Sequence, residues 1–131
     1  MIIDNQTEHP FSIRFIAILG STGSIGTQAL EVIRQNPDRF RVSVLTAQSN
    51  SALLIQQALE FKPAYVVIGD ETKCPEIEAA LKEHKIKVLC GLADLAEVVT
   101  LPEIDIVLTA LVGFAGLRPT LAAITAGKDI R

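Results

Sequence analysis

The stretch Gly20-Ser21-Thr22-Gly23-Ser24-Ile25-Gly26 decides the fold of this chain, because it joins two segments of different pattern. Before it, the mostly aliphatic run Arg14–Leu19 predicts a buried strand. After it, residues 24–35 place apolar side chains at helical spacing and stop at Asn36-Pro37, since the residue before a proline is disfavoured in a helix. The spacing G-x-x-G-x-x-G is a variant of the dinucleotide-binding fingerprint, which occupies such a strand-to-helix turn. The sequence therefore predicts a turn that cradles phosphates.

Each glycine of this motif has an expected role. Gly20 permits the tight turn, Gly23 lets a pyrophosphate approach the backbone, and Gly26 lets the helix pack closely on the strand. Backbone N–H groups at the start of the helix favour phosphate oxygens, and the hydroxyls of Thr22 and Ser24 add hydrogen bonds. A P-loop is excluded because no Gly-Lys-Ser/Thr follows.

The rest of the chain continues the alternation of strand and helix. We expect strands at residues 14–19, 40–46, 64–68, 86–90 and 104–109, and helices at 24–35, 51–61, 75–84, 92–100 and 118–126. Asn50 or Ser51 is the expected N-cap of the second helix. Residues 128–131 read as the approach to a sixth strand, so we expect the chain to be a fragment. This alternation predicts an α/β fold, Rossmann-like and doubly wound, with a mainly parallel sheet and helices on both faces.

Length and composition indicate one globular domain. The chain has 131 residues, of which 49% are hydrophobic and 21% charged. We expect a flexible leader at residues 1–13 and a dinucleotide-binding domain at residues 14–131, truncated at its C-terminal end.

Several classes of partner are not supported by the sequence. The net charge is −3 and no basic stripe exists, which argues against nucleic acid. The apolar stretch at residues 106–117 is too short to cross a membrane. Cys74 and Cys90 lie sixteen positions apart, without a C-x-x-C and without metal-ligand spacing to a histidine, so we expect reduced thiols and no metal site. A cytoplasmic protein fits these observations.

The turn after the second strand bears on the choice between NAD and NADP. An NAD site usually places Asp or Glu there to hold the ribose hydroxyls, whereas no carboxylate occurs from residue 39 to residue 59. The turn reads Gln48-Ser49-Asn50, and its missing acid favours NADPH over NADH. Because it also lacks Arg and Lys, Ser49, Asn50 and the next helix start would have to hold the 2′-phosphate. The alternative is that these residues only cap the helix.

A second candidate segment follows the fifth strand, and no catalytic group is found. Residues 109–116 are small or apolar and could let a flat ring approach the backbone, although a plain apolar connection explains them as well. His84 and the acids around it fit a solvated helix face. We therefore expect no catalytic residue and a cofactor platform without its substrate domain.

Several stretches resemble one enzyme family, the 1-deoxy-D-xylulose 5-phosphate reductoisomerases. The most specific are residues 16–26 and Val112-Gly113-Phe114-Ala115-Gly116-Leu117. Supporting stretches are residues 36–37, 40–42, 47–50, 59–61, 119–124 and 126–128. The resemblance covers residues 14–130.

The resemblance implies an enzyme that uses NADPH to isomerise and reduce 1-deoxy-D-xylulose 5-phosphate to 2-C-methyl-D-erythritol 4-phosphate, in non-mevalonate isoprenoid synthesis. It implies Mg or Mn, a homodimer, and inhibition by fosmidomycin, all for the full-length protein. The residues carried over to the cofactor site are Thr22, Gly23, Ser24 and Ile25 at the pyrophosphate, and Gln48, Ser49 and Asn50 beside the adenosine ribose phosphate.

Two departures from the family pattern stand out. The turn at residues 48–50 often reads Gly-Lys-Asn or Gly-Ser-Asn in the family. The family also continues past its Ala-Gly-Lys segment into an Asn-Lys-Glu-Ser motif and metal-binding carboxylates, whereas this sequence has Arg131. We therefore expect the fragment to be inactive alone. The alternatives are the cofactor domain of a semialdehyde dehydrogenase-type reductase, which needs a catalytic cysteine, and a non-catalytic dinucleotide-sensing module.

Overall fold

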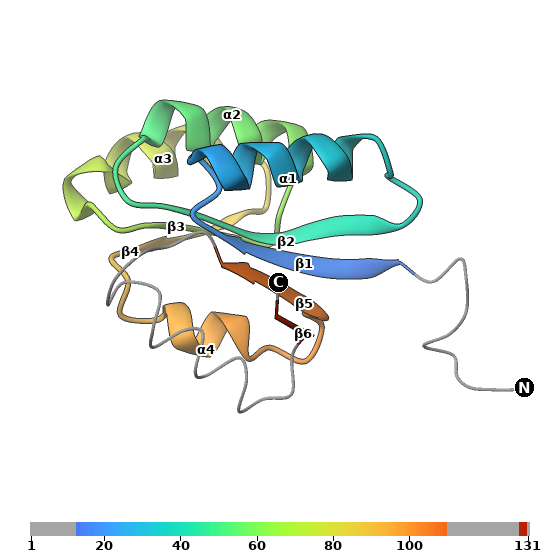
Figure 1. Ribbon diagram of the computed structural model, residues 1–131. Coiled ribbons are helices and arrows are strands. Elements are labelled where there is room, and N and C mark those ends of the chain that lie inside the picture. Colours follow the sequence, from blue (N-terminus) through green and yellow to red (C-terminus); the bar gives the residue numbers. More distant parts are fainter. Residues whose placement is uncertain (1–12, 110–128, 131) are drawn as a thin grey trace, which may run out of the picture.

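A six-stranded parallel sheet organises the chain in the computed structural model, which describes residues 13–109 and 129–130 (Figure 1). The strands are β1 (Arg14–Leu19), β2 (Phe40–Ala47), β3 (Tyr65–Ile68), β4 (Lys87–Cys90), β5 (Ile106–Thr109) and β6 (Asp129–Ile130). The helices are α1 (Ser24–Arg34), α2 (Ser51–Phe61), α3 (Cys74–Leu81) and α4 (Leu95–Val99), with a 3-10 turn, η2 (Glu71–Lys73), before α3.

The predicted elements are confirmed within this part of the chain. The largest differences are at the ends of helices: η2 precedes α3, and α4 begins at Leu95 instead of residue 92. Helix α3 ends at Leu81 instead of residue 84, so His84 is exposed in the turn after α3 and not on a helix face. The expected leader, the expected helix at 118–126 and most of the segment at 109–116 lie outside the described residues.

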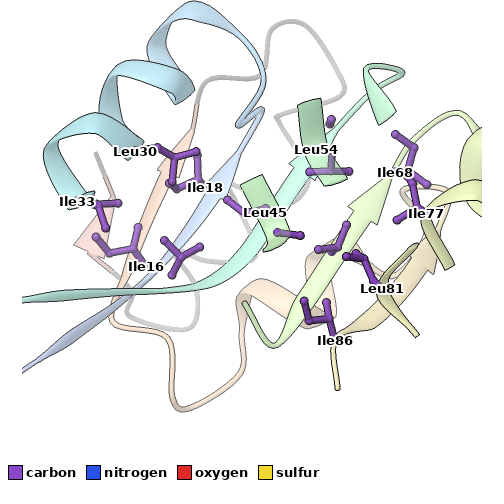
Figure 2. Packing of buried hydrophobic residues seen from close by; sticks show 14 of the residues in the cluster. Ile16, Ile18, Leu30, Ile33, Leu45, Leu54, Ile68, Ile77, Leu81 and Ile86 are labelled. Atoms are coloured by element: carbon purple, nitrogen blue, oxygen red, sulfur yellow. The ribbon is translucent and has the colours of Figure 1, made fainter. Parts of the chain in front are cut away.

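Both faces of the sheet are buried, as the doubly wound prediction requires. Helices α1, α2 and α3 cover one face and α4 lies on the other (Figure 1). Along β1, Ile16 and Ile18 pack into the cluster beneath the first three helices, whereas Ala17 and Leu19 join the cluster beneath α4. Figure 2 shows the first cluster, in which helix residues such as Leu30 meet strand residues from above. Alternate strand residues therefore serve two cores, which explains the continuous apolar runs of the sequence.

The strand order places a reversal beside β1. The order is β4-β3-β2-β1-β5-β6, so the chain steps outward from β1 to β4 and then returns to β5 on the other side of β1. Leu19, the last residue of β1, pairs with Thr46 of β2 and with Thr109 of β5. Ligands of open α/β sheets bind outside the carboxyl ends of the strands at such a reversal. The glycine-rich turn follows β1 at this position.

The two cysteines form a disulfide, so the expectation of reduced and unrelated thiols is wrong for this structure. Cys74 and Cys90 are joined with their Cα atoms 5.7 Å apart. Cys74 starts α3 soon after β3 ends, and Cys90 ends β4, which lies beside β3. Parallel pairing thus brings both cysteines to the same edge of the sheet. Their spacing in the sequence carried no sign of this contact.

Candidate cofactor site

The glycine-rich turn is shaped by two positions that accept no other residue easily. Gly20 has φ = +88°, a conformation that side chains rarely adopt. A Cβ on Gly26 would lie 2.3 Å from the Gly20 carbonyl oxygen and 2.6 Å from the Ser21 Cα, both backbone atoms. The expected roles of Gly20 in the turn and of Gly26 in close packing are thus confirmed.

Gly23 differs from these two glycines. Its backbone is extended, with φ = −81° and ψ = 178°, and any residue can adopt that conformation. A Cβ there would come no closer than 3.8 Å to the Gly20 carbonyl oxygen, an ordinary contact. Neither the backbone nor the packing of the described residues therefore requires a glycine at this position. What its missing side chain leaves open is space on the exposed outer side of the turn.

The start of α1 offers donors to an anion. Gly23 is the N-cap and supplies no side-chain cap, and the first turn contains no acid. The first N–H groups of a helix have no partner within the helix, and its dipole favours negative charge there. Ser24 and Ile25 are exposed and Thr22 is half-buried. The four predicted residues of this turn are contiguous and accessible at the end of β1.

A buried hydrogen-bond network fixes the turn against the neighbouring strand and helix. The Ser21 hydroxyl donates to Gln57 Oε1 (2.7 Å), and Gln57 Nε2 donates to the Ser21 carbonyl oxygen (2.9 Å). The Ser21 N–H donates to the Thr46 carbonyl oxygen (2.8 Å), and the Gly20 N–H donates to Thr46 Oγ1 (2.9 Å). Ser21, Thr46 and Gln57 are all at least 94% buried. Sequence reasoning missed Gln57, although a glutamine on the apolar stripe of a helix is a signal that could have found it.

The second predicted turn follows β2 and is exposed at Gln48, Ser49 and Asn50. Asn50 caps α2, because its Oδ1 accepts a hydrogen bond from the Leu53 N–H (3.2 Å). The capping prediction is therefore confirmed for Asn50. The cap uses the side-chain oxygen, and the Nδ2 group is a donor that an anion can use.

The segment after β3 supports this second turn, which the sequence did not indicate. The N–H groups of Gly69 and Asp70 donate to the carbonyl oxygens of Ala47 (2.9 Å) and Gln48 (2.7 Å). The Gln48 side chain lies across Gly69, with its Oε1 within 2.5 Å of where a Cβ would stand. In the sequence, the Gly69-Asp70 pair directly after the third strand is the feature that could have indicated this supporting loop.

Asp70 brings a carboxylate close to a turn that otherwise lacks one. Its Oδ1 accepts hydrogen bonds from the Thr72 hydroxyl (2.6 Å) and the Thr72 N–H (3.1 Å). These bonds, aided by the charge of Lys73, hold the pKa of Asp70 below its usual value. The carboxylate is thus engaged with its own loop, and the positive charge of Lys73 acts on it there.

A hard divalent metal does not fit the described residues. Among them, the one group of His, Cys, Asp and Glu side chains close enough to share an ion is Cys74, Glu78 and Cys90. Two of these are joined in the disulfide, whereas Mg²⁺ requires several oxygen ligands.

In the part of the chain that the structure describes, no helix is long and apolar enough to span a membrane.

Comparison with known proteins agrees with this architecture. Residues 16–131 match the family model described as 1-deoxy-D-xylulose 5-phosphate reductoisomerase. The enzyme of that name from Porphyromonas gingivalis is 55% identical over 115 residues, which is 88% of this chain and 30% of the relative.

Solved structures of reductoisomerases are similar as well. The Zymomonas mobilis reductoisomerase in complex with NADPH is 34% identical, with a TM-score of 0.85 over 91% of this chain and 31% of that one. A reductoisomerase complex with NADPH, fosmidomycin and magnesium is 37% identical, with a TM-score of 0.84 over 90% of this chain and 29% of that one. This chain therefore spans about 30% of the length of the relatives it matches, and it belongs to the 1-deoxy-D-xylulose 5-phosphate reductoisomerase family.

Proposed function

We propose that residues 14–131 form an NADPH-binding domain and that the protein containing it isomerises and reduces 1-deoxy-D-xylulose 5-phosphate to 2-C-methyl-D-erythritol 4-phosphate. The observation that carries the proposal is Gly23, a glycine that its surroundings do not require, at an uncapped helix start beside the strand-order reversal. Related proteins with the same fold are described in complex with NADPH. The family match favours this enzyme over a semialdehyde dehydrogenase-type reductase.

The two turns divide the cofactor between them. The N–H groups of the turn at Thr22, Gly23, Ser24 and Ile25 hold the pyrophosphate, because they point out of the start of α1. Gln48, Ser49 and Asn50 lie beside the adenosine ribose. The Ser49 hydroxyl and the Asn50 amide group donate to the 2′-phosphate. The bound cofactor supplies the hydride for the reduction.

Other features belong to the protein as a whole. The relatives are about three times as long as this chain, so we assign the reaction, the sugar-phosphate substrate and a divalent metal, Mg or Mn, to residues beyond those described. The 131-residue chain alone binds cofactor without turning over substrate. The full-length protein is a cytoplasmic homodimer. This proposal rests on the resemblance to the family.

A calorimetric titration of the chain with NADPH and then with NADH tests the cofactor assignment. We expect NADPH to bind more tightly than NADH, and Gly23→Ala to weaken NADPH binding at least tenfold because the new Cβ fills the space of the pyrophosphate. Gln28→Ala, an exposed change on α1, serves as the control and should bind normally. Equal NADPH affinity of Gly23→Ala and the unsubstituted chain would overturn the site. Tighter binding of NADH than of NADPH would overturn the assignment of the 48–50 turn.

A further inference from the structure

We propose that Cys74 and Cys90 are a reversible dithiol–disulfide site that tightens the adenosine end of the cofactor site when it is oxidised. The existence of the site rests on the cysteine pair alone. Its effect on NADPH rests on the function proposed above.

The disulfide joins an accessible cysteine to a buried one. Cys90 is exposed at the end of β4, which is the edge strand of the sheet, whereas Cys74 is 97% buried at the start of α3. A small thiol or disulfide can reach Cys90 from solvent, and Cys74 is then positioned to attack the sulfur of Cys90. A disulfide with one exposed sulfur is of the kind that small thiols reduce, and such bonds are typical of redox-responsive sites.

The bond closes a loop that leads directly to the second cofactor turn. The Asp70 N–H holds the Gln48 carbonyl oxygen (2.7 Å), and Thr72 holds the Asp70 carboxylate. The 3-10 turn η2 then runs into Cys74. On the other side, the Gly91 N–H donates to the Ile68 carbonyl oxygen (2.7 Å).

The Glu71 side chain adds a second contact between these two segments, because its Oε2 lies 2.9 Å from where a Cβ on Gly91 would stand. With the disulfide formed, residues 69–74 are tied at both ends, to β2 and to the end of β4. Reduction removes one tie and leaves the segment behind Gln48 with more freedom. A site that must be ordered on binding has lower affinity than one that is already ordered.

The chemistry balances with oxidised glutathione as the oxidant. The Cys90 thiolate attacks a glutathione sulfur, which forms a mixed disulfide and releases one glutathione. The Cys74 thiolate then attacks the Cys90 sulfur, which forms the Cys74–Cys90 bond and releases the second glutathione. The two cysteines lose two electrons and two protons in total, and one glutathione disulfide becomes two glutathione thiols.

The site itself is tested by mapping the bond. The chain is equilibrated with EDTA in oxidised or reduced glutathione buffer, alkylated, digested, and analysed by peptide mass. We expect a Cys74–Cys90 linked peptide in the oxidised sample and two alkylated cysteines in the reduced sample. A failure to form the linked peptide would overturn the site.

The coupling is tested by calorimetry with 2′,5′-ADP, which carries only the adenosine end of NADPH. We expect roughly three- to tenfold weaker binding by the reduced chain than by the oxidised chain. Cys90→Ser, which changes the exposed partner and spares the buried one, should bind like the reduced chain in both buffers. Equal affinity in the two states would overturn the coupling. Absence of binding in both states would overturn the proposed function and the coupling with it, while the peptide map still decides the site.

Discussion

In the glycine-rich motif, Gly26 is needed for the folding of the turn, whereas in the proposed function Gly23 is needed for the binding of the cofactor. We predict that Gly26→Ala destabilises the chain by about 1–3 kcal/mol, because its Cβ would press on the backbone of Gly20 and Ser21, which cannot move aside. Gly23→Ala, whose Cβ would make only an ordinary contact, should change stability by less than about 1 kcal/mol. Urea unfolding of the two variants measures both values. Similar losses in the two variants would contradict the separate roles.

At this scale the sequence reveals which residue types are needed but not what each one contacts. The motif indicated tight packing at Gly26 and a tight turn at Gly20, since those roles follow from the spacing of the fingerprint. It did not indicate Gln57 or Asp70, whose partners are 36 and 22 residues away in the chain. Such contacts depend on how elements pack, which a local pattern does not contain.

The start of α2 combines a structural and a binding role in Asn50, and two substitutions distinguish them. Asn50→Ala removes the cap to the Leu53 N–H and should cost about 1 kcal/mol of stability. Asn50→Asp keeps a good cap, because Asp and Asn are equivalent N-caps, but places a negative charge where the 2′-phosphate is expected. We predict near-normal unfolding for Asn50→Asp together with a loss of the preference for NADPH over NADH. Unfolding curves and calorimetry measure the two effects, and a retained preference would contradict the role of this turn.

At the scale of elements, the side chain of Gln57 also attaches α2 to the glycine-rich turn. We predict that Gln57→Leu destabilises the chain by about 1–3 kcal/mol, because the buried Ser21 carbonyl oxygen loses the donor Gln57 Nε2. The Ser21 hydroxyl loses Gln57 Oε1 and keeps the longer bond to the Thr46 carbonyl oxygen (3.2 Å). Gln56→Leu, at the exposed neighbouring position, is the control and should have little effect. A double-mutant cycle with Ser21→Ala should show a coupling energy of about 0.5 kcal/mol or more. Additive losses would mean that the two side chains act independently.

The order of elements was predictable because each strand and helix carries its own signal. Apolar runs identify the strands. Asn36-Pro37 marks the end of α1, Asn50 the start of α2, and Gly69 the end of β3. The weak places were short elements: η2 was missed and α4 is shorter than predicted, since a few residues give little periodicity to interpret.

For the whole molecule, the doubly wound prediction implied a reversal of strand order, but the sequence did not indicate that β5 is the strand on the far side of β1. That position brings the end of β1 to the reversal where the candidate site lies, and it results from packing both faces of the sheet at once. The disulfide follows from the same cause, because adjacent parallel strands bring distant residues to one edge.

An ion pair between Arg34 and Glu60 joins the C-terminal ends of α1 and α2, and it makes the stability of the chain depend on pH. Arg34 donates to the Glu60 carboxylate from Nε (2.5 Å) and from Nη2 (2.9 Å), and its guanidinium lies 5.4 Å from the centre of the Phe61 ring. The hydrogen bond from Arg34 holds the pKa of Glu60 below its ordinary value, which is about 4.3 in an unfolded chain. A carboxyl group with a lowered pKa in the folded state stabilises that state above its unfolded pKa and loses this effect as pH falls through its folded pKa.

We therefore predict that the melting temperature falls as the pH is lowered below about 4.3. Glu60→Gln should make this fall shallower. The effect is small because both side chains are nearly half exposed, and added salt should reduce it further. Thermal melts from pH 3 to pH 7 measure it, with Glu83→Gln as a matched exposed control. Asp70 adds to the same acid-side loss, because Thr72 lowers its pKa too, so Thr72→Val should also flatten the curve. An unchanged acid slope in Glu60→Gln would show that the link between α1 and α2 does not contribute to the stability of the folded chain.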